Sequence, residues 1–187
     1  MIPDALDHYR WMARYNAWFN DRLYDACERL DDATRKRDSG AFFGSIHNTL
    51  NHLIVADQIW LQRLHQCGLD NGFDAAALSP QVLDLAPGHG LAESAFDDWA
   101  ALRAKRRQLD DAIGQWLAAM APEFPGFTMQ YANSKGVQRQ HPAWRAMSHF
   151  FNHQTHHRGQ VTTLLMQAGV DVGVTDLLAL LGPDHPH

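Results

Sequence analysis

The chain contains little cysteine, and its two thiols form no recognised motif. Cys27 and Cys67 are the only cysteines among 187 residues, and they do not form a Cys-x-x-Cys pair. Each falls within a helical pattern, so we expect each to be a small buried hydrophobe. This usage argues against a disulfide and against a soft-metal site built on cysteine.

Long apolar runs and an excess of basic residues are also missing. No run approaches the roughly 18 apolar residues that a membrane span needs, and the net charge of −5 gives no basic footprint for nucleic acid. The first residues lack the basic and apolar regions of a secretory signal. We therefore expect a cytoplasmic protein without nucleic-acid or membrane partners, and its 45% hydrophobic and 20% charged residues are typical of a globular domain.

Hydrophobic periodicity predicts four long helices, over residues 5–30, 45–66, 91–120 and 142–169. The first has a stripe at steps of three and four, formed by Leu6, Tyr9, Ala13, Asn16, Phe19, Leu23, Cys27 and Leu30. Residues 31–44 read as a charged connection. Residues 69–90 are rich in Gly, Pro, Asp and Ala and are long for a tight helical hairpin, which predicts an end-to-end crossover.

Two shorter features complete the expected fold. Residues 127–131 and 137–140 flank an Asn-Ser-Lys-Gly turn, which predicts a β-hairpin. Residues 175–181 are apolar enough for one or two packing turns. We therefore expect an all-α protein, a four-helix bundle with a long crossover connection and a small β-hairpin before the last helix, forming a single domain over residues 1–187.

Histidine is the abundant residue, with 12 in the chain, and two of them interrupt an apolar face. His153 and His157 lie on the core stripe of the last helix, at i and i+4, so both rings point to one place. Burying a polar ring without a partner costs on the order of 1–3 kcal/mol, and one metal ion would satisfy both. A lone histidine on such a face is usually a hydrogen-bonded core residue. The spacing matches His-Glu-x-x-His, but Gln154 occupies the glutamate position, which argues against a metalloprotease.

A third ligand has to come from another helix, and the second helix offers two histidines. His47 and His52 lie about 140° apart at roughly 100° per residue, so only one faces the site. His52 is mid-helix among apolar residues, and we expect it to be the more buried and therefore the ligand. Asp57 is also about 140° from His52, so we expect it to support the site from outside or to lie on the surface.

Three further residues on the last helix have open roles. His149 lies one turn before His153, but each step of four drifts about 40° around the helix, which makes it the more distant ring. Gln160 is one turn from His157 and can hydrogen-bond a ligand ring or serve as an ordinary surface amide. Gly159 costs about 1 kcal/mol in a helix relative to alanine, so we expect close approach of another backbone there.

Two strings resemble a known family. Asn152-His-Gln-Thr-His-His-Arg-Gly-Gln160 looks like the last-helix motif of the DinB (damage-inducible) family, and Asn51-His-Leu-Ile-Val-Ala-Asp-Gln-Ile-Trp60 looks like its second-helix motif. The hairpin and the apolar tail also fit. This resemblance implies a four-helix bundle with crossed connectivity, often a homodimer, and a metal site on three histidines, which fall here on His52, His153 and His157. The ion implied is zinc or nickel.

The resemblance also suggests chemistry, because related bundles include mycothiol-dependent maleylpyruvate isomerases and bacillithiol transferases. Three protein ligands leave one coordination position open, which is the catalytic pattern. The first hypothesis is a metal-dependent transferase, in which a low-molecular-weight thiol binds the metal and attacks a small electrophilic substrate. The alternatives are a metal-dependent hydrolase, for which no acid or base is evident, and a non-catalytic, metal-stabilised binding module connected with stress.

Overall fold

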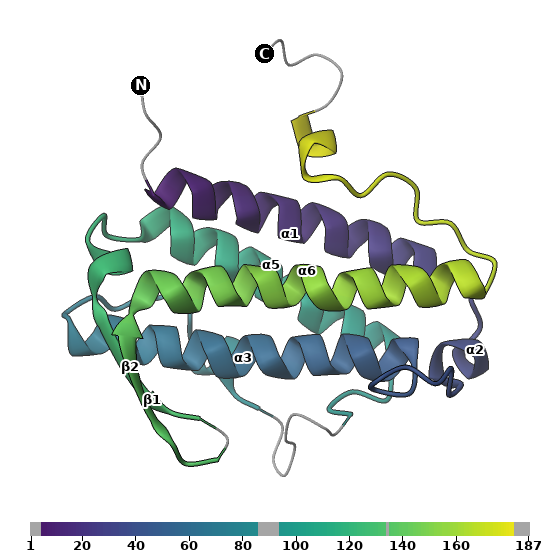
Figure 1. Ribbon diagram of the computed structural model, residues 1–187, viewed down its shortest axis with the longest axis horizontal. Helices are drawn as coiled ribbons and strands as arrows, with labels where there is room; N and C mark the ends of the chain where they lie inside the picture. Colours follow the sequence, from purple (N-terminus) through teal and green to yellow (C-terminus); the bar gives the residue numbers. More distant parts are fainter. Residues whose placement is uncertain (1–4, 86–93, 134, 182–187) are drawn as a thin grey trace.

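A computed structural model describes residues 5–85, 94–133 and 135–181, and four long helices dominate it. Their bounds are α1 (Ala5–Glu28), α3 (Ile46–Asp70), α5 (Trp99–Ala119) and α6 (Ala143–Gln167). Helices α1 and α6 run in one direction, and α3 and α5 run in the other (Figure 1). Helix α1 packs against α5 and α6, and α3 packs against the same two helices. The expected all-α bundle is confirmed.

The stripe expected on the first helix is its buried face. Its members from Leu6 to Cys27 are all buried, including Asn16, which is 1% exposed, and only Leu30, beyond the helix end, is half-buried. Both cysteines are free and buried, as the helical pattern predicted. The core continues through α3, α5 and α6 with large side chains such as Trp116 and Phe150.

The connections hold more structure than the sequence suggested. The charged stretch after α1 contains a short helix α2 (Asp32–Lys36), and the crossover contains α4 (Pro80–Leu83). The third long helix begins at Trp99 and not at residue 91, because the Asp98 side chain accepts a hydrogen bond from the Ala101 amide and caps the helix there. Residues 91–93 of the expected helix lie outside the described residues.

The crossover is confirmed by the contacts of Phe96. The connection leaves α3 at its C-terminal end, yet Phe96 lies beside the first turns of the same helix. Its amide donates to Asn51 Oδ1 at 2.8 Å, and its carbonyl accepts from Asn51 Nδ2 at 3.0 Å and from His47 Nε2 at 2.7 Å. The chain has therefore travelled the length of α3 before α5 begins.

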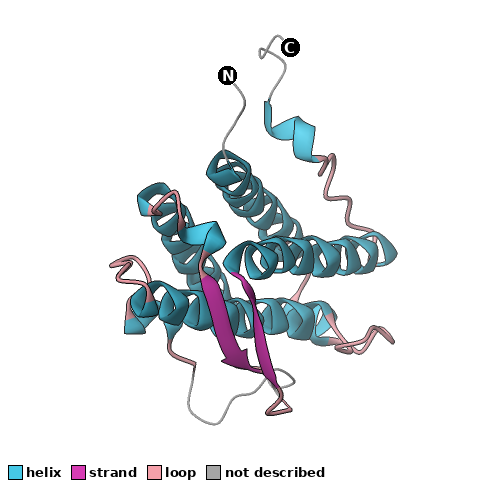
Figure 2. Ribbon diagram, turned by 60° about the vertical axis from the view of Figure 1, so that its left-hand side comes forward, coloured by secondary structure: helices cyan, strands magenta, loops and turns pink. Residues whose placement is uncertain are grey.

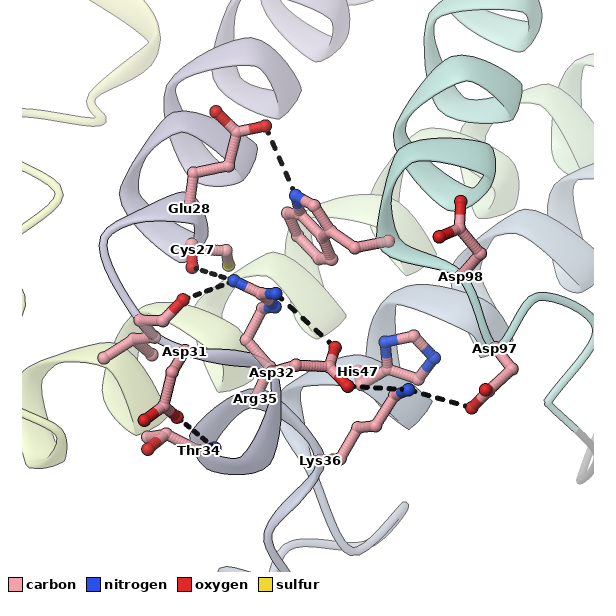
Figure 3. A network of polar contacts seen from close by, with 12 residues as sticks. Cys27, Glu28, Asp31, Asp32, Thr34, Arg35, Lys36, His47, Asp97 and Asp98 are labelled. Carbon is pink, nitrogen blue, oxygen red and sulfur yellow. Dashed lines mark hydrogen bonds and ion pairs between the residues drawn. The ribbon is translucent and has the colours of Figure 1, made fainter.

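A polar network fixes this end of the bundle (Figure 3). The Arg35 guanidinium donates to the carbonyls of Cys27 and Leu30, at the end of α1, and stacks over Trp99 with 4.5 Å to the ring centroid. Lys36 lies 2.9 Å from Asp97, just before α5. Helix α2 thus ties the end of α1 to the start of α5.

The expected hairpin is present, shifted by one or two residues. Strands β1 (Thr128–Ala132) and β2 (Gln138–Pro142) pair antiparallel, with Gln130 opposite Gln140, and the hairpin lies against α3 (Figure 2). Two 3₁₀ turns, η1 (Phe124–Gly126) and η2 (Leu177–Leu181), precede β1 and follow α6. Among the described residues, no helix combines the length and apolar character needed to cross a bilayer.

Candidate metal centre

Three histidine rings meet between the second turn of α3 and the middle of α6, two helices that lie side by side. His153 Nε2 is 3.3 Å from His52 Nε2 and 3.0 Å from His157 Nε2. One ligand atom from each ring lies within 4.8 Å of the other two, so the three could hold one metal ion. The structure therefore brings together the trio expected from the sequence.

The hydrogen bond of His157 determines which nitrogen faces the cluster. Its Nδ1–H donates to Gln160 Oε1 at 2.7 Å, so in the neutral ring the Nε2 lone pair points at His153. His153 Nε2 lies within hydrogen-bonding distance of both other Nε2 atoms, but one proton on it can bond only one of them well, whereas a cation between the rings would satisfy all three nitrogens. A ligand histidine held through its other nitrogen is the usual arrangement in metal sites. The donor set therefore fits a divalent ion.

Burial favours the neutral form of two of these rings, His153 and His157. His52 and His157 are 9% and 7% exposed, and His153 is half-buried. Burial, followed by the neighbouring His157 and His52 rings, lowers the pKa of His153 to about 3. Burial also lowers the pKa of His157, against its hydrogen bond to Gln160. Since neutral imidazole is the form that binds metals, the rings are prepared for ligation.

We expected His52 to be more buried than His47, and this prediction was wrong. His47 is only 2% exposed and is therefore the more buried of the two. It points away from the cluster, because its Nε2–H donates to the Phe96 carbonyl. Helix face, and not burial, separates the two histidines.

Other residues with open roles now have places. His149 packs on Trp60 at 4.8 Å between ring centroids, and its ring lies 5.8 Å from that of His153, outside the convergent trio. Gln160 does accept a hydrogen bond from a candidate metal ligand, His157. The prediction for Gly159 was wrong, since a Cβ there would meet nothing within 4 Å, and nothing in the structure explains this glycine.

Asp57 is neither a ligand nor a surface residue. It is 1% exposed and lies 2.6 Å from Arg106 Nη1, and it also accepts from Gln154 Nε2. Burial raises the pKa of Asp57 to about 6, against the opposing effect of Arg106. Gln154 neighbours His153, so this carboxylate joins α3 to α6 directly beside the cluster.

These contacts belong to a closed ring of buried polar side chains that links all four long helices. Arg106 Nε–H donates to Asp110 Oδ2 at 3.1 Å, and Asp110 Oδ1 accepts from Asn16 Nδ2 at 3.1 Å. Asn16 accepts from Arg158, which lies 3.5 Å from Gln154 Oε1. We call this set the charged ring; its members are Asn16, Asp57, Arg106, Asp110, Gln154 and Arg158.

Sequence reasoning missed the charged ring, although one signal was present. Asn16 stands on the apolar stripe of α1, and a buried amide needs a partner. Phe43, which covers part of the histidine cluster, was missed as well. It lies in a connection, where no periodicity marks a functional residue.

The fold and the cluster define a class of protein: helical bundles in which side chains of facing helices form a potential metal site. Within this class the chain belongs to the DinB family, whose model matches residues 6–185. It is similar to Protein DinB of Bacillus subtilis (strain 168), with 26% identity over 163 residues, or 87% of each chain. No solved structure gives a significant match. The resemblance inferred from the two helix motifs is confirmed.

Proposed function

We propose that His52, His153 and His157 hold one zinc or nickel ion, and that the protein is a metal-dependent transferase acting through a low-molecular-weight thiol. The observation that carries this is the convergence of three imidazoles from two helices. Three protein ligands are the pattern of catalytic zinc sites, which keep one position open for water or substrate.

The chain's own residues supply binding and orientation. His157 is fixed by Gln160, and the helices that carry the histidines are joined by the bond between Asp57 and Gln154. When bound, the ion would supply a positive charge that stabilises a thiolate, the nucleophilic form of a thiol.

The neutral surroundings favour a thiol over water as the nucleophile. His153 and His157 contact other rings and the Gln160 amide, and the buried Asp57 carboxylate is engaged with Arg106. Hydrolysis of an ester or amide needs an acid to protonate the leaving group, whereas a thiolate held at the ion, its proton having passed to solvent, would add to an electrophile without one. This supports the transferase over the hydrolase.

The test is a rate comparison between wild type and His153→Ala. Both proteins are incubated with zinc or nickel, their metal content is measured, and they are assayed against a panel of thiols and electrophilic acceptors. We expect thiol conjugation only in the metal-loaded wild type. Metal binding without any rate above the variant would refute the transferase, and ester hydrolysis in its place would support the hydrolase.

A purely structural role for the metal predicts a different outcome. Chelation would then lower the melting temperature sharply, and no added thiol would change the spectrum of the bound metal. A small-molecule substrate and a homodimer remain predictions, which the same samples test by thiol titration and by light scattering.

A further inference from the structure

Phe43 lies in the loop between α2 and α3, and its ring covers two of the three histidines. The ring centroids of Phe43 and His52 are 4.0 Å apart with an angle of 22° between the planes, which is a stacked arrangement. Phe43 meets His157 edge-on, at 5.5 Å and 61°. Stacked and edge-on aromatic pairs attract beyond the area that they bury. A hydrocarbon ring therefore closes one side of the cluster.

The backbone of the loop fixes the position of this ring. Ser39 N–H donates to the Gly44 carbonyl at 2.7 Å, and Gly44 N–H donates to the Ala41 carbonyl at 2.8 Å. Gly40 and Gly44 have φ of 69° and 79°, a conformation that glycine adopts without strain. The turn is thus built so that Phe43 faces the cluster directly before α3 begins.

The neighbouring residue provides a contrast within the same loop. Phe42 is 86% exposed, whereas Phe43 is half-buried. Two identical side chains, adjacent in sequence, therefore differ in that one meets solvent and the other meets the histidines. Phe42 also contacts the Phe43 ring edge-on, with 4.9 Å between the ring centroids, so Phe42→Ala is a control for the loss of an exposed aromatic ring from this loop.

The position of Phe43 limits how an added ligand reaches the cluster. The ring lies on His52 and His157, the two less exposed rings of the trio, while the half-buried His153 retains more contact with solvent. Solvent access is therefore restricted on the side of Phe43. A ligand that enters beside His153 and reaches the other two histidines would contact the Phe43 ring.

We propose that Phe43 is a specificity-determining residue, which limits the three-histidine centre to a single added ligand and selects thiols with an aromatic or apolar body. This inference rests on the proposed metal binding. It adds the chemical class of thiol that the site would accept.

Cobalt(II) tests the first part, because its visible absorption is strong with four ligands and falls several-fold with five or six. Metal-free wild type, Phe43→Ala, Phe43→Leu and Phe42→Ala are titrated with Co²⁺, and folding is checked by circular dichroism. We expect four-coordinate spectra for wild type, Phe43→Leu and Phe42→Ala, and several-fold weaker absorption for Phe43→Ala, since added water enters where the ring was removed.

Identical spectra of cobalt-loaded Phe43→Ala and wild type would overturn this part of the inference. Absence of cobalt binding in wild type would instead refute the proposed function, so the two failures are distinguishable.

The second part is tested with Phe43→Leu, which keeps an apolar side chain and removes the ring. Benzyl mercaptan and 2-mercaptoethanol are titrated against the cobalt-loaded proteins, and binding is followed by the sulfur-to-cobalt charge-transfer band. We expect the preference for benzyl mercaptan, as a ratio of Kd values, to fall by about threefold to tenfold relative to wild type and Phe42→Ala. An unchanged ratio in Phe43→Leu would overturn the assignment.

Discussion

Two buried polar clusters lie side by side in this bundle, and they are completed in different ways. Helix α6 contributes His153 and His157 to one and Gln154 and Arg158 to the other, each pair at i and i+4. The charged ring contains two carboxylates and two guanidiniums, so the chain itself supplies both signs of charge. The histidine cluster gathers three rings whose Nε2 atoms converge. In the charged ring, cationic side chains of the chain itself balance the carboxylates. The histidine cluster gathers metal-ligating nitrogens, and the comparison indicates that its cation would come from outside the chain.

The largest effect is expected from breaking the charged ring at Arg106. Arg106→Leu leaves Asp57 and Asp110 without their guanidinium in a buried position, where an unpaired charge costs about 3–5 kcal/mol. Urea unfolding of the metal-free protein measures this loss. Arg107→Leu is the control, since its ion pair with Asp21 is 58% and 60% exposed and should contribute less than about 1 kcal/mol. Equal losses in the two variants would show that the charged ring has no special role.

The histidine cluster should respond in metal affinity. His153→Ala removes the central ring, and we expect a loss of affinity above about 100-fold, because removing a mere partner of a ligand already costs 10- to 100-fold. Competition with a chromophoric chelator measures the affinity. His149→Ala is the control, one turn away and outside the trio. If His149→Ala binds metal as weakly as His153→Ala, the centre has four ligands.

The next prediction concerns Gln160, which holds the candidate ligand His157 through a hydrogen bond. Gln160→Leu removes the acceptor that holds His157 Nδ1–H, so either imidazole nitrogen can carry the proton. We expect metal affinity to fall by about 10- to 100-fold. Gln160→Glu keeps an acceptor oxygen at the same place and should retain the affinity. Loss in both variants would point to a general disturbance of α6, and not to the orientation of one ring.

The fold and the histidine trio could be predicted from sequence because both depend on helical periodicity. The stripe of α1 and the i, i+4 pair on α6 require only 3.6 residues per turn. His52 does lie with His153 and His157, but the argument from burial was wrong, since His47 is buried too. Periodicity places a residue on a face of its helix and does not reveal which neighbouring element covers that face.

The missed features depend on contacts between distant segments. The charged ring depends on the packing of four helices. Asp57 and Arg106 are 49 residues apart, and no local sequence pattern predicts their contact. The start of α5 was placed too early because Phe96 is held by Asn51 of α3, a tertiary interaction that overrides local propensity. Phe43 lies in a loop, whose course is set by its turn and not by a repeat.

The last effect concerns pH and should differ in sign between the two clusters. Burial raises the pKa of Asp57 to about 6, above the value near 4 of an unfolded aspartate. Its contribution to the free energy of unfolding is therefore complete below about pH 4 and is lost as pH rises through 6. Burial lowers the pKa of His153, so the contribution of His153 to the free energy of unfolding is present above about pH 6.5 and is lost as pH falls.

We expect the difference in unfolding free energy between wild type and Asp57→Asn, both metal-free, to decrease from pH 4 to 6 and then level off. Histidine titration is common to both proteins and cancels in this difference. A difference that increases with pH would mean that the attraction of Arg106 outweighs burial, and that the charged ring holds Asp57 ionised.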